Sequence, residues 1–132
     1  MGYFIDPITY EPLGGSTNNV GTAVSAAGSA HTKGSFASLG TTGSDWCGFD
    51  LEVVASGSTS TRHFIDVAIG TTVVASDIFF NTNGTNGRLI ISLPIHIPAG
   101  SQIQVRHQSS SASTSINMQV RGWRYGPRTP RG

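Results

Sequence analysis

The chain has 132 residues, a formal net charge of +1, and only 11% charged against 37% hydrophobic residues. This length corresponds to one domain with a modest core, and a low net charge with many Val, Ile and Thr residues excludes an intrinsically disordered chain. The balance is also too neutral for a typical nucleic-acid-binding domain, and the single cysteine, Cys47, excludes an internal disulfide.

Residues 1–19 are predicted to form an extended N-terminal arm. They carry Tyr3, Phe4 and Tyr10 among prolines and glycines, without apolar alternation over the length of a strand. Such a segment either folds back on its own domain or docks on a neighbour, and the sequence leaves both open. The beginning lacks the basic and apolar regions of a signal peptide, and no apolar run approaches membrane-spanning length, so we expect a protein assembled in a cytoplasm, without membrane contact.

Residues 20–125 show short β-branched segments separated by turn signals, and no helical period. This pattern predicts an all-β fold: a two-sheet antiparallel sandwich of about eight strands, with the jelly roll as leading topology. Extended arms flank it at both ends, the C-terminal one at 126–132. The predicted strands are 20–27, 32–39, 46–55, 62–69, 72–80, 88–97, 101–108 and 114–125.

Alternation in the strand at 46–55 assigns its side chains to two faces. Cys47, Phe49, Leu51 and Val53 fall on the apolar side, so Cys47 is expected to be a buried, inert thiol. Trp46 and the carboxylates of Asp50 and Glu52 fall on the other side, where we expect solvent. In the strand at 62–69, His63 shares the apolar row and Asp66 lies on the opposite face.

The run from Leu93 to Arg106 is predicted to be a β-hairpin with its corner at 97–101. Pairing 97 with 102 would set Ile95 against Gln104. The register that sets Ile95 against Ile103 and Leu93 against Val105 is favoured, because it joins apolar side chains on one face.

No pattern of catalytic, cofactor-binding or metal-ligating residues emerges from the sequence. The four histidines lack the spacing of a zinc site and are expected to be isolated. There is no nucleophile elbow, phosphate loop or dinucleotide fingerprint, and Asp45, Asp50 and Glu52 have the ordinary spacing of one strand. We therefore expect no enzyme, no metal and no cofactor.

The C-terminal end mixes arginines with aromatic residues. Such a mixture occurs on nucleic-acid surfaces, but the overall charge and the lack of a recognised motif argue against direct nucleic-acid contact. Seven arginines against two acidic residues give residues 61–132 a charge of +5, while residues 1–60 carry −4, which suits pairing between subunits or with an acidic partner. The residues expected to contact a partner chain, including those of the N-terminal arm, are Tyr3, Phe4, Tyr10, Trp123, Arg124, Tyr125, Arg128 and Arg131.

Three segments carry a resemblance to known proteins: Trp46-Cys47-Gly48-Phe49-Asp50-Leu51-Glu52, His63-Phe64-Ile65-Asp66-Val67-Ala68-Ile69-Gly70, and the run from Leu93 to Arg106 with its Leu-Pro-Ile and Ile-Pro-Ala-Gly-Ser motifs. In this order and spacing they resemble small jelly-roll virion proteins of tailed bacteriophages. The resemblance covers roughly residues 46–107 and is strongest to capsid cement or decoration proteins.

The resemblance implies a structural protein on the capsid surface that binds the major capsid protein, as a homo-oligomer and specifically a trimer, and that bridges neighbouring shell subunits. Related jelly rolls also occur in tails and fibres. The alternative is therefore a host-recognition module that binds carbohydrate, with Trp46, or Trp123 beside Arg124, as the stacking surface.

Overall fold

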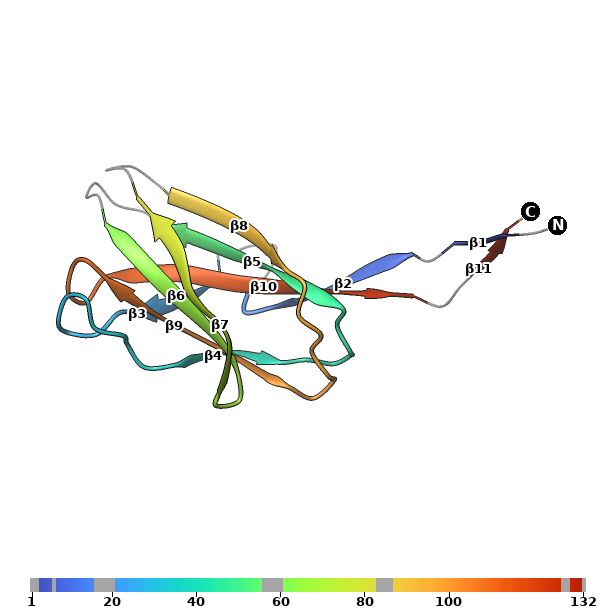
Figure 1. Cartoon of the computed structure of the whole chain (residues 1–132), viewed down its shortest axis with the longest axis horizontal. Coiled ribbons are helices and arrows are strands. Elements are labelled where there is room, and N and C mark those ends of the chain that lie inside the picture. Colours follow the sequence, from blue (N-terminus) through green and yellow to red (C-terminus); the bar gives the residue numbers. More distant parts are fainter. Residues whose placement is uncertain are drawn as a thin grey trace.

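The computed structural model of the chain describes residues 3–5, 7–15, 21–55, 61–82, 87–126 and 129–131, with side chains described only between 7 and 126. These ranges contain strands and no helix (Figure 1). The strands are β1 (Tyr3–Ile5), β2 (Ile8–Leu13), β3 (Thr22–Ser25), β4 (Ala37–Thr41), β5 (Gly48–Ala55), β6 (Arg62–Ile69), β7 (Thr72–Asn81), β8 (Gly87–Leu93), β9 (Gln102–Ser109), β10 (Ser115–Tyr125) and β11 (Thr129–Arg131).

Two antiparallel sheets face each other. One has the order β2-β10-β5-β8, with β3 also paired to β10, and the other has the order β4-β9-β6-β7. The pairs are nested: β6 pairs with β7, β5 with β8, β4 with β9, and β3 with β10. One long antiparallel hairpin, wound over its own core, produces this order, which is that of a jelly roll. The predicted fold class is confirmed.

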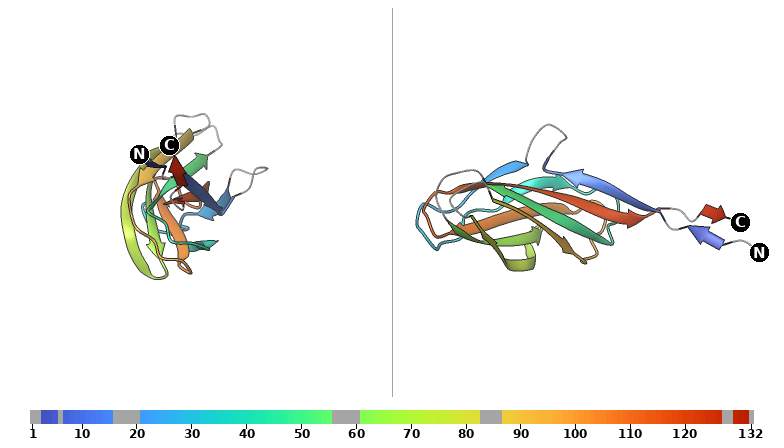
Figure 2. Two further views of the ribbon diagram at one scale, coloured as in Figure 1. Left: turned by 90° about the vertical axis from the view of Figure 1, so that its right-hand side faces the viewer. Right: turned by 90° about the horizontal axis from the view of Figure 1, so that it is seen from above.

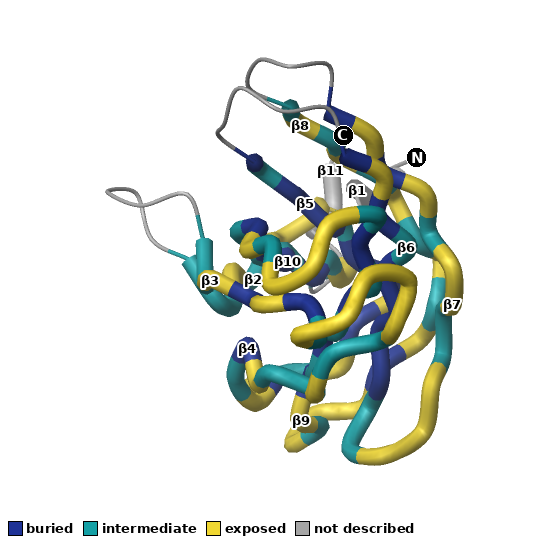
Figure 3. Tube along the Cα trace, turned by 90° about the vertical axis from the view of Figure 1, so that its left-hand side faces the viewer, coloured by how far each residue is buried: buried dark blue, intermediate teal, exposed yellow. Residues whose placement is uncertain are grey.

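The core fills the space between the sheets because the strands alternate in polarity. Along β10, Ile116, Met118 and Val120 are buried, while the side chains of Asn117, Gln119 and Arg121 face outward. Figure 3 shows the buried residues gathered between the sheets, whereas β7 on the outside is largely exposed. Trp46 is also buried in this core. Its indole ring lies against Gly122 and occupies the space that a Cβ on that glycine would need.

The predicted hairpin between Leu93 and Arg106 is wrong in its pairing. β8 pairs with β5 in one sheet, whereas β9 pairs with β4 and β6 in the other, so Leu93 and Val105 are not opposite each other. The prolines between the two strands remove backbone donors and favour a crossing between sheets over a tight turn. The predicted core face is nevertheless confirmed, since Ile103 and Val105 are buried and Leu93 and Ile95 pack against the core.

The predicted faces of Trp46 and Cys47 are also wrong. β5 begins only at Gly48, and Trp46 instead forms an isolated bridge with Ile97. The side-chain alternation of the strand therefore does not extend to these two residues. Trp46 is fully buried, and Cys47 is exposed.

Residues 1–19 contain strands where the sequence predicted none. β2 pairs with β10 from Leu13 opposite Val120 to Ile8 opposite Tyr125, and β1 pairs with β11. The β2 side chains are mostly exposed, so its sequence lacks the alternation of a half-buried strand. Its conformation follows from pairing with β10. Figures 1 and 2 show the two chain ends side by side, beyond one end of the sandwich.

Candidate assembly surface on the terminal ribbon

The first and last strands pair at one edge of the sheet that contains β5, and they continue beyond β5 as two strands; we call these paired segments the terminal ribbon. It consists of β2 (Ile8–Leu13) paired with residues 120–125 of β10, followed by β1 paired with β11. The amide of Gly126 donates a hydrogen bond to the carbonyl of Pro7 at 2.7 Å, which continues the pairing beyond Tyr125. The ribbon thus carries both chain ends away from the core (Figure 2).

One face of the ribbon carries four large apolar or aromatic side chains: Ile8, Tyr10, Trp123 and Tyr125. Tyr10 lies opposite Trp123, and Ile8 lies opposite Tyr125. Residues directly opposite in an antiparallel pair share a face, so the four form one surface, which we call the ribbon patch. Ile8 is 52%, Tyr10 53% and Tyr125 59% exposed.

The ribbon patch borders a shallow trough of about 280 Å³ on the outer face of the sheet, lined by Ile8, Tyr10, Asp50, Ser92 and Trp123. Trp123 lies over Gly48, where the indole occupies the space that a Cβ would need. On β5 and β8, Asp50 accepts a hydrogen bond of 2.7 Å from the Ser92 hydroxyl. The trough therefore combines an aromatic wall with a hydroxyl–carboxylate pair.

Glu11 holds the opposite face of the ribbon against the sandwich. Its carboxylate accepts hydrogen bonds from Trp46 Nε1 at 2.7 Å, the Gly43 amide at 2.8 Å and the Ser44 hydroxyl at 3.1 Å. Burial raises the pKa of Glu11, but these hydrogen bonds outweigh it and bring the pKa below its ordinary value. The base of the ribbon is thus fixed to the core by a charged anchor.

The structure brings together three of the residues predicted to bind a partner, Tyr10, Trp123 and Tyr125. Arg124, also exposed, pairs with Thr9 and alternates to the other face of the ribbon. Tyr3, Phe4 and Arg131 lie in the paired strands β1 and β11, and Arg128 lies outside the described residues. Sequence reasoning missed Ile8, because only its pairing opposite Tyr125 adds it to the patch.

Asp66, predicted to lie on the face opposite His63, and Glu52, which was expected to face solvent, are both buried. Asp66 accepts hydrogen bonds from Lys33 Nζ at 2.6 Å, Arg106 Nε at 2.9 Å and the Asp77 amide at 3.0 Å. Burial raises the pKa of Asp66, but these bonds, that from Lys33 foremost, lower it below the ordinary value. Glu52 is buried under Arg88 and Gln119. Both carboxylates lie on the predicted outer faces, where long side chains cover them.

Two of the histidines expected to be isolated meet in the core. His63 Nδ1 lies 3.2 Å from His107 Nδ1, and both rings are fully buried. The remaining nitrogens are also engaged: His107 Nε2 lies 2.8 Å from the Val24 carbonyl, and His63 Nε2 lies 2.8 Å from the Thr61 hydroxyl. No group of three or more metal-ligating residues occurs within the described ranges.

The hydrogen-bond partners assign the protons of this pair. The Val24 carbonyl only accepts, so His107 carries its proton on Nε2 and accepts at Nδ1. His63 therefore donates from Nδ1 and accepts from Thr61 at Nε2. Burial lowers the pKa of His63 to about 4, with a further contribution from the repulsion between the two rings when both are protonated, and burial also lowers the pKa of His107. The pair is neutral at pH 7.

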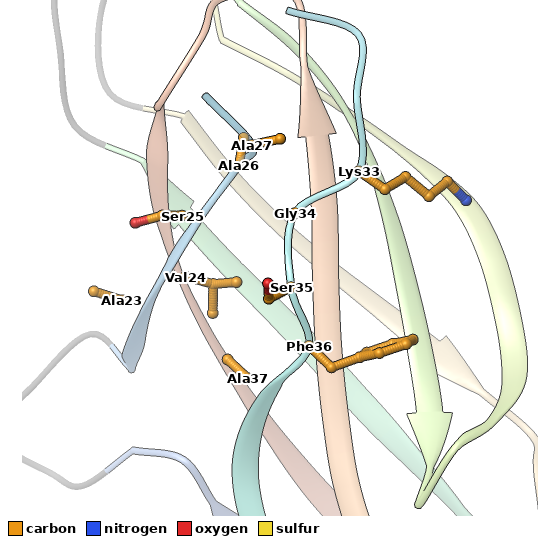
Figure 4. A pocket seen from close by; sticks show the side chains of 10 residues that line it. All are labelled: Ala23, Val24, Ser25, Ala26, Ala27, Lys33, Gly34, Ser35, Phe36 and Ala37. Atoms are coloured by element: carbon orange, nitrogen blue, oxygen red, sulfur yellow. The ribbon is translucent and has the colours of Figure 1, made fainter. Parts of the chain in front are cut away.

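A groove of about 470 Å³ lies between β3 and the segment leading into β4 (Figure 4). Both strands are sheet edges, so the groove is the open side of the sandwich. Its lining is mostly Ala, Ser and Gly, and the side chains of Lys33 and Phe36 point away from β3. None of the residues predicted to bind a partner lines it.

One solved structure that matches is a cryo-EM structure of broad bean stain virus, with 12% sequence identity and a TM-score of 0.43. The match covers 69% of this chain and 64% of the viral chain. No protein-family model and no curated protein matches the sequence. Among the described residues, no helix has the length and hydrophobicity needed to cross a membrane.

Proposed function

We propose that the protein is a structural component of a virion that docks on a partner protein through its terminal ribbon. The observation that carries the proposal is the ribbon patch, whose members Ile8, Tyr10 and Tyr125 each expose about half of their surface outside the core. Isolated apolar residues are common on protein surfaces, but a contiguous patch of this kind is typical of an interaction site. Tyrosine and tryptophan are also enriched among residues that dominate binding energy.

The form of the ribbon supports docking as well. β1 and β11 form a two-stranded sheet, and because such a sheet is by itself only marginally stable in water, it would gain stability from a surface that covers it. Glu11 fixes the base of the ribbon to Trp46. The ribbon is thus attached to a rigid body at one end and available to a partner at the other.

The resemblance to tailed-phage proteins narrows the proposal to a capsid cement or decoration protein on the outer surface of the shell. Its partner is then the major capsid protein, and its assembly a trimer. Cement function needs a folded body and a second contact that reaches a neighbouring subunit, so that separating the subunits exposes additional surface. The sandwich supplies the body and the terminal ribbon supplies the reach.

Binding to shells tests this proposal. Preformed shells of the phage are mixed with the protein, and co-sedimentation is measured for wild type, for Ile8→Ser/Tyr125→Ser and for Val73→Ser/Phe79→Ser. The control pair is similarly exposed, with Val73 at 40% and Phe79 at 51%, but lies on the other sheet. We expect the ribbon variant to bind at least about tenfold more weakly. Equal binding by the two variants would contradict the proposal.

A second candidate function is carbohydrate binding by a tail or fibre module. The trough beside Trp123 favours it, because sugar rings stack on indoles while hydroxyls and carboxylates such as Ser92 and Asp50 bond their edges. Trp46, the other residue expected to stack on a sugar, is fully buried and therefore offers no stacking surface. Cryo-EM of the virion separates the two functions: density on the shell favours cement, and density only at the tail favours the second candidate.

A further inference from the structure

Among the described residues, the two sheets of the sandwich have four edges, and three of these are interrupted in ways that oppose pairing with another strand. The edge opposite β8 is split between the short strands β2 and β3, and β2 contains Pro12, which lacks an amide donor. The pairing of β4 shifts register between Ser38 and Gly40. β7 pairs irregularly with β6 and includes Asp77 at a positive φ of 56°. Such features are common protections of exposed sheet edges.

The fourth edge, β8, has none of these protections. Its seven residues pair with β5 in unbroken register, from Gly87 opposite Ala55 to Leu93 opposite Phe49. Among the described residues no strand lies on its other side (Figure 1). Every second residue of β8 therefore presents its backbone amide and carbonyl to an open edge.

The side chains of β8 leave apolar surface incompletely covered on both faces. On the inner face, Leu89, Ile91 and Leu93 pack against the core but are only partly buried. On the outer face, Ile90 is 50% exposed at the middle of the strand. A strand added beside β8 would cover both groups.

We propose that β8 pairs antiparallel with β8 of a second copy of this chain, across a two-fold axis at Ile90. Ile90 is the central residue of Gly87–Leu93, so this register is the one that aligns the whole strand with its copy. It sets Leu89 opposite the partner's Ile91, which keeps the apolar inner faces together. It also sets Arg88 opposite the partner's Ser92, and Ile90 opposite the partner's Ile90.

The charges at this edge are compatible with such pairing. Arg88 is already held by Glu52 on its own β5, so the added strand buries no unpaired cation. The partner's Ser92 donates a hydrogen bond to the partner's Asp50. The proposed register therefore brings the carboxylate of the partner's Asp50 toward Arg88. Since like charges do not meet, the self-complementary register needs no compensating ion.

A contact between two strand edges is smaller than the interfaces of stable dimers, so we expect weak, concentration-dependent association of free protein. On a particle surface the high local concentration of copies would favour it. The contact is independent of the ribbon patch, and it is not the proposed trimer contact, because a two-fold edge pair closes after two copies.

Site-directed cross-linking tests the register. In a Cys47→Ser background, Ile90→Cys and Phe79→Cys are treated with a short bis-maleimide cross-linker at high protein concentration. Both positions are similarly exposed, and Phe79 lies on β7, which is one of the three interrupted edges. We expect a cross-linked dimer from Ile90→Cys, in at least about tenfold greater yield than from Phe79→Cys. Equal yields, or no dimer from Ile90→Cys, would overturn the proposal.

Sedimentation velocity gives a second, label-free test. Wild type should show a species of doubled mass that grows with concentration, whereas Ile90→Lys, which brings two cations to the axis, should lack it. The matched variant Phe79→Lys should behave as wild type. A wild type without this species of doubled mass, or the same species in Ile90→Lys, would refute the edge pair and leave the proposed shell binding to be judged by its own variants.

Discussion

Lowering the pH from 7 to 5 should destabilise the protein through the histidine pair in its core. In the folded chain the pKa of His63 is about 4, against an ordinary value of 6.5, because the ring is buried beside His107. Neither ring has a free nitrogen to accept a proton, since Thr61 and His63 already donate to the two acceptor nitrogens. Protonation of either ring therefore breaks a buried hydrogen bond.

The sign and size of the effect follow from proton linkage. The unfolded chain takes up a proton on His63 below pH 6.5, while the folded chain resists until about pH 4, so stability falls as the pH falls through this window. With these two values, the loss between pH 7 and pH 5 is about 2 kcal/mol, and it approaches about 3 kcal/mol near pH 4. The lowered pKa of His107 adds to the loss.

Urea unfolding at pH 7, 6 and 5 measures this loss. His63→Gln retains a donor and an acceptor but does not titrate, so its stability should fall clearly less than that of wild type over the same range. His96→Gln, at an exposed position, is the control and should follow wild type. The buried carboxylates have lowered pKa values, so their contribution is lost mainly below this window. A wild-type loss below about 0.5 kcal/mol, or the same loss in His63→Gln, would refute the reasoning.

Two further substitutions and one chemical reaction test whether single residues are buried or exposed. Gly122→Ala should lower the free energy of unfolding by about 2 to 4 kcal/mol in thermal denaturation, because the added methyl overlaps a buried indole, whereas Gly28→Ala, with open space around it, should change it by less than about 0.5 kcal/mol. Asp66→Asn should cost about 2 to 4 kcal/mol in urea unfolding because two cations lose their buried counter-ion, and the same change at exposed Asp77 should cost less than about 1 kcal/mol; equal costs would contradict the burial of Asp66. Cys47 should react fully with a thiol reagent in the native protein, and reaction only after unfolding would restore the buried thiol predicted from sequence.

Strand content and topology could be predicted because the strands inside the sandwich alternate in polarity. The strand at 62–69 has the predicted bounds, and the predicted apolar row of Phe49, Leu51 and Val53 is buried in β5. The same rule failed where a residue near a strand belongs to no regular ladder. Trp46 precedes β5 and takes its place in the core through Ile97 and Gly122, neither of which is near it in sequence.

The candidate site was predictable only in part. Aromatic residues at both chain ends suggested a contact surface, but their convergence depends on the pairing of β2 with β10, for which exposed side chains leave no periodic signal. The histidine pair is a similar case, since His63 and His107 are brought together by the pairing of β6 with β9. Non-local pairing of this kind is decided by the whole fold rather than by local pattern.

A cryo-EM reconstruction of the particle tests the central claim most directly. We expect a jelly roll on the outside of the shell, with the terminal ribbon against the major capsid protein and Ile8, Tyr10 and Tyr125 buried in that contact. Density for the protein on the shell with the ribbon patch facing solvent, or density confined to the tail, would contradict it.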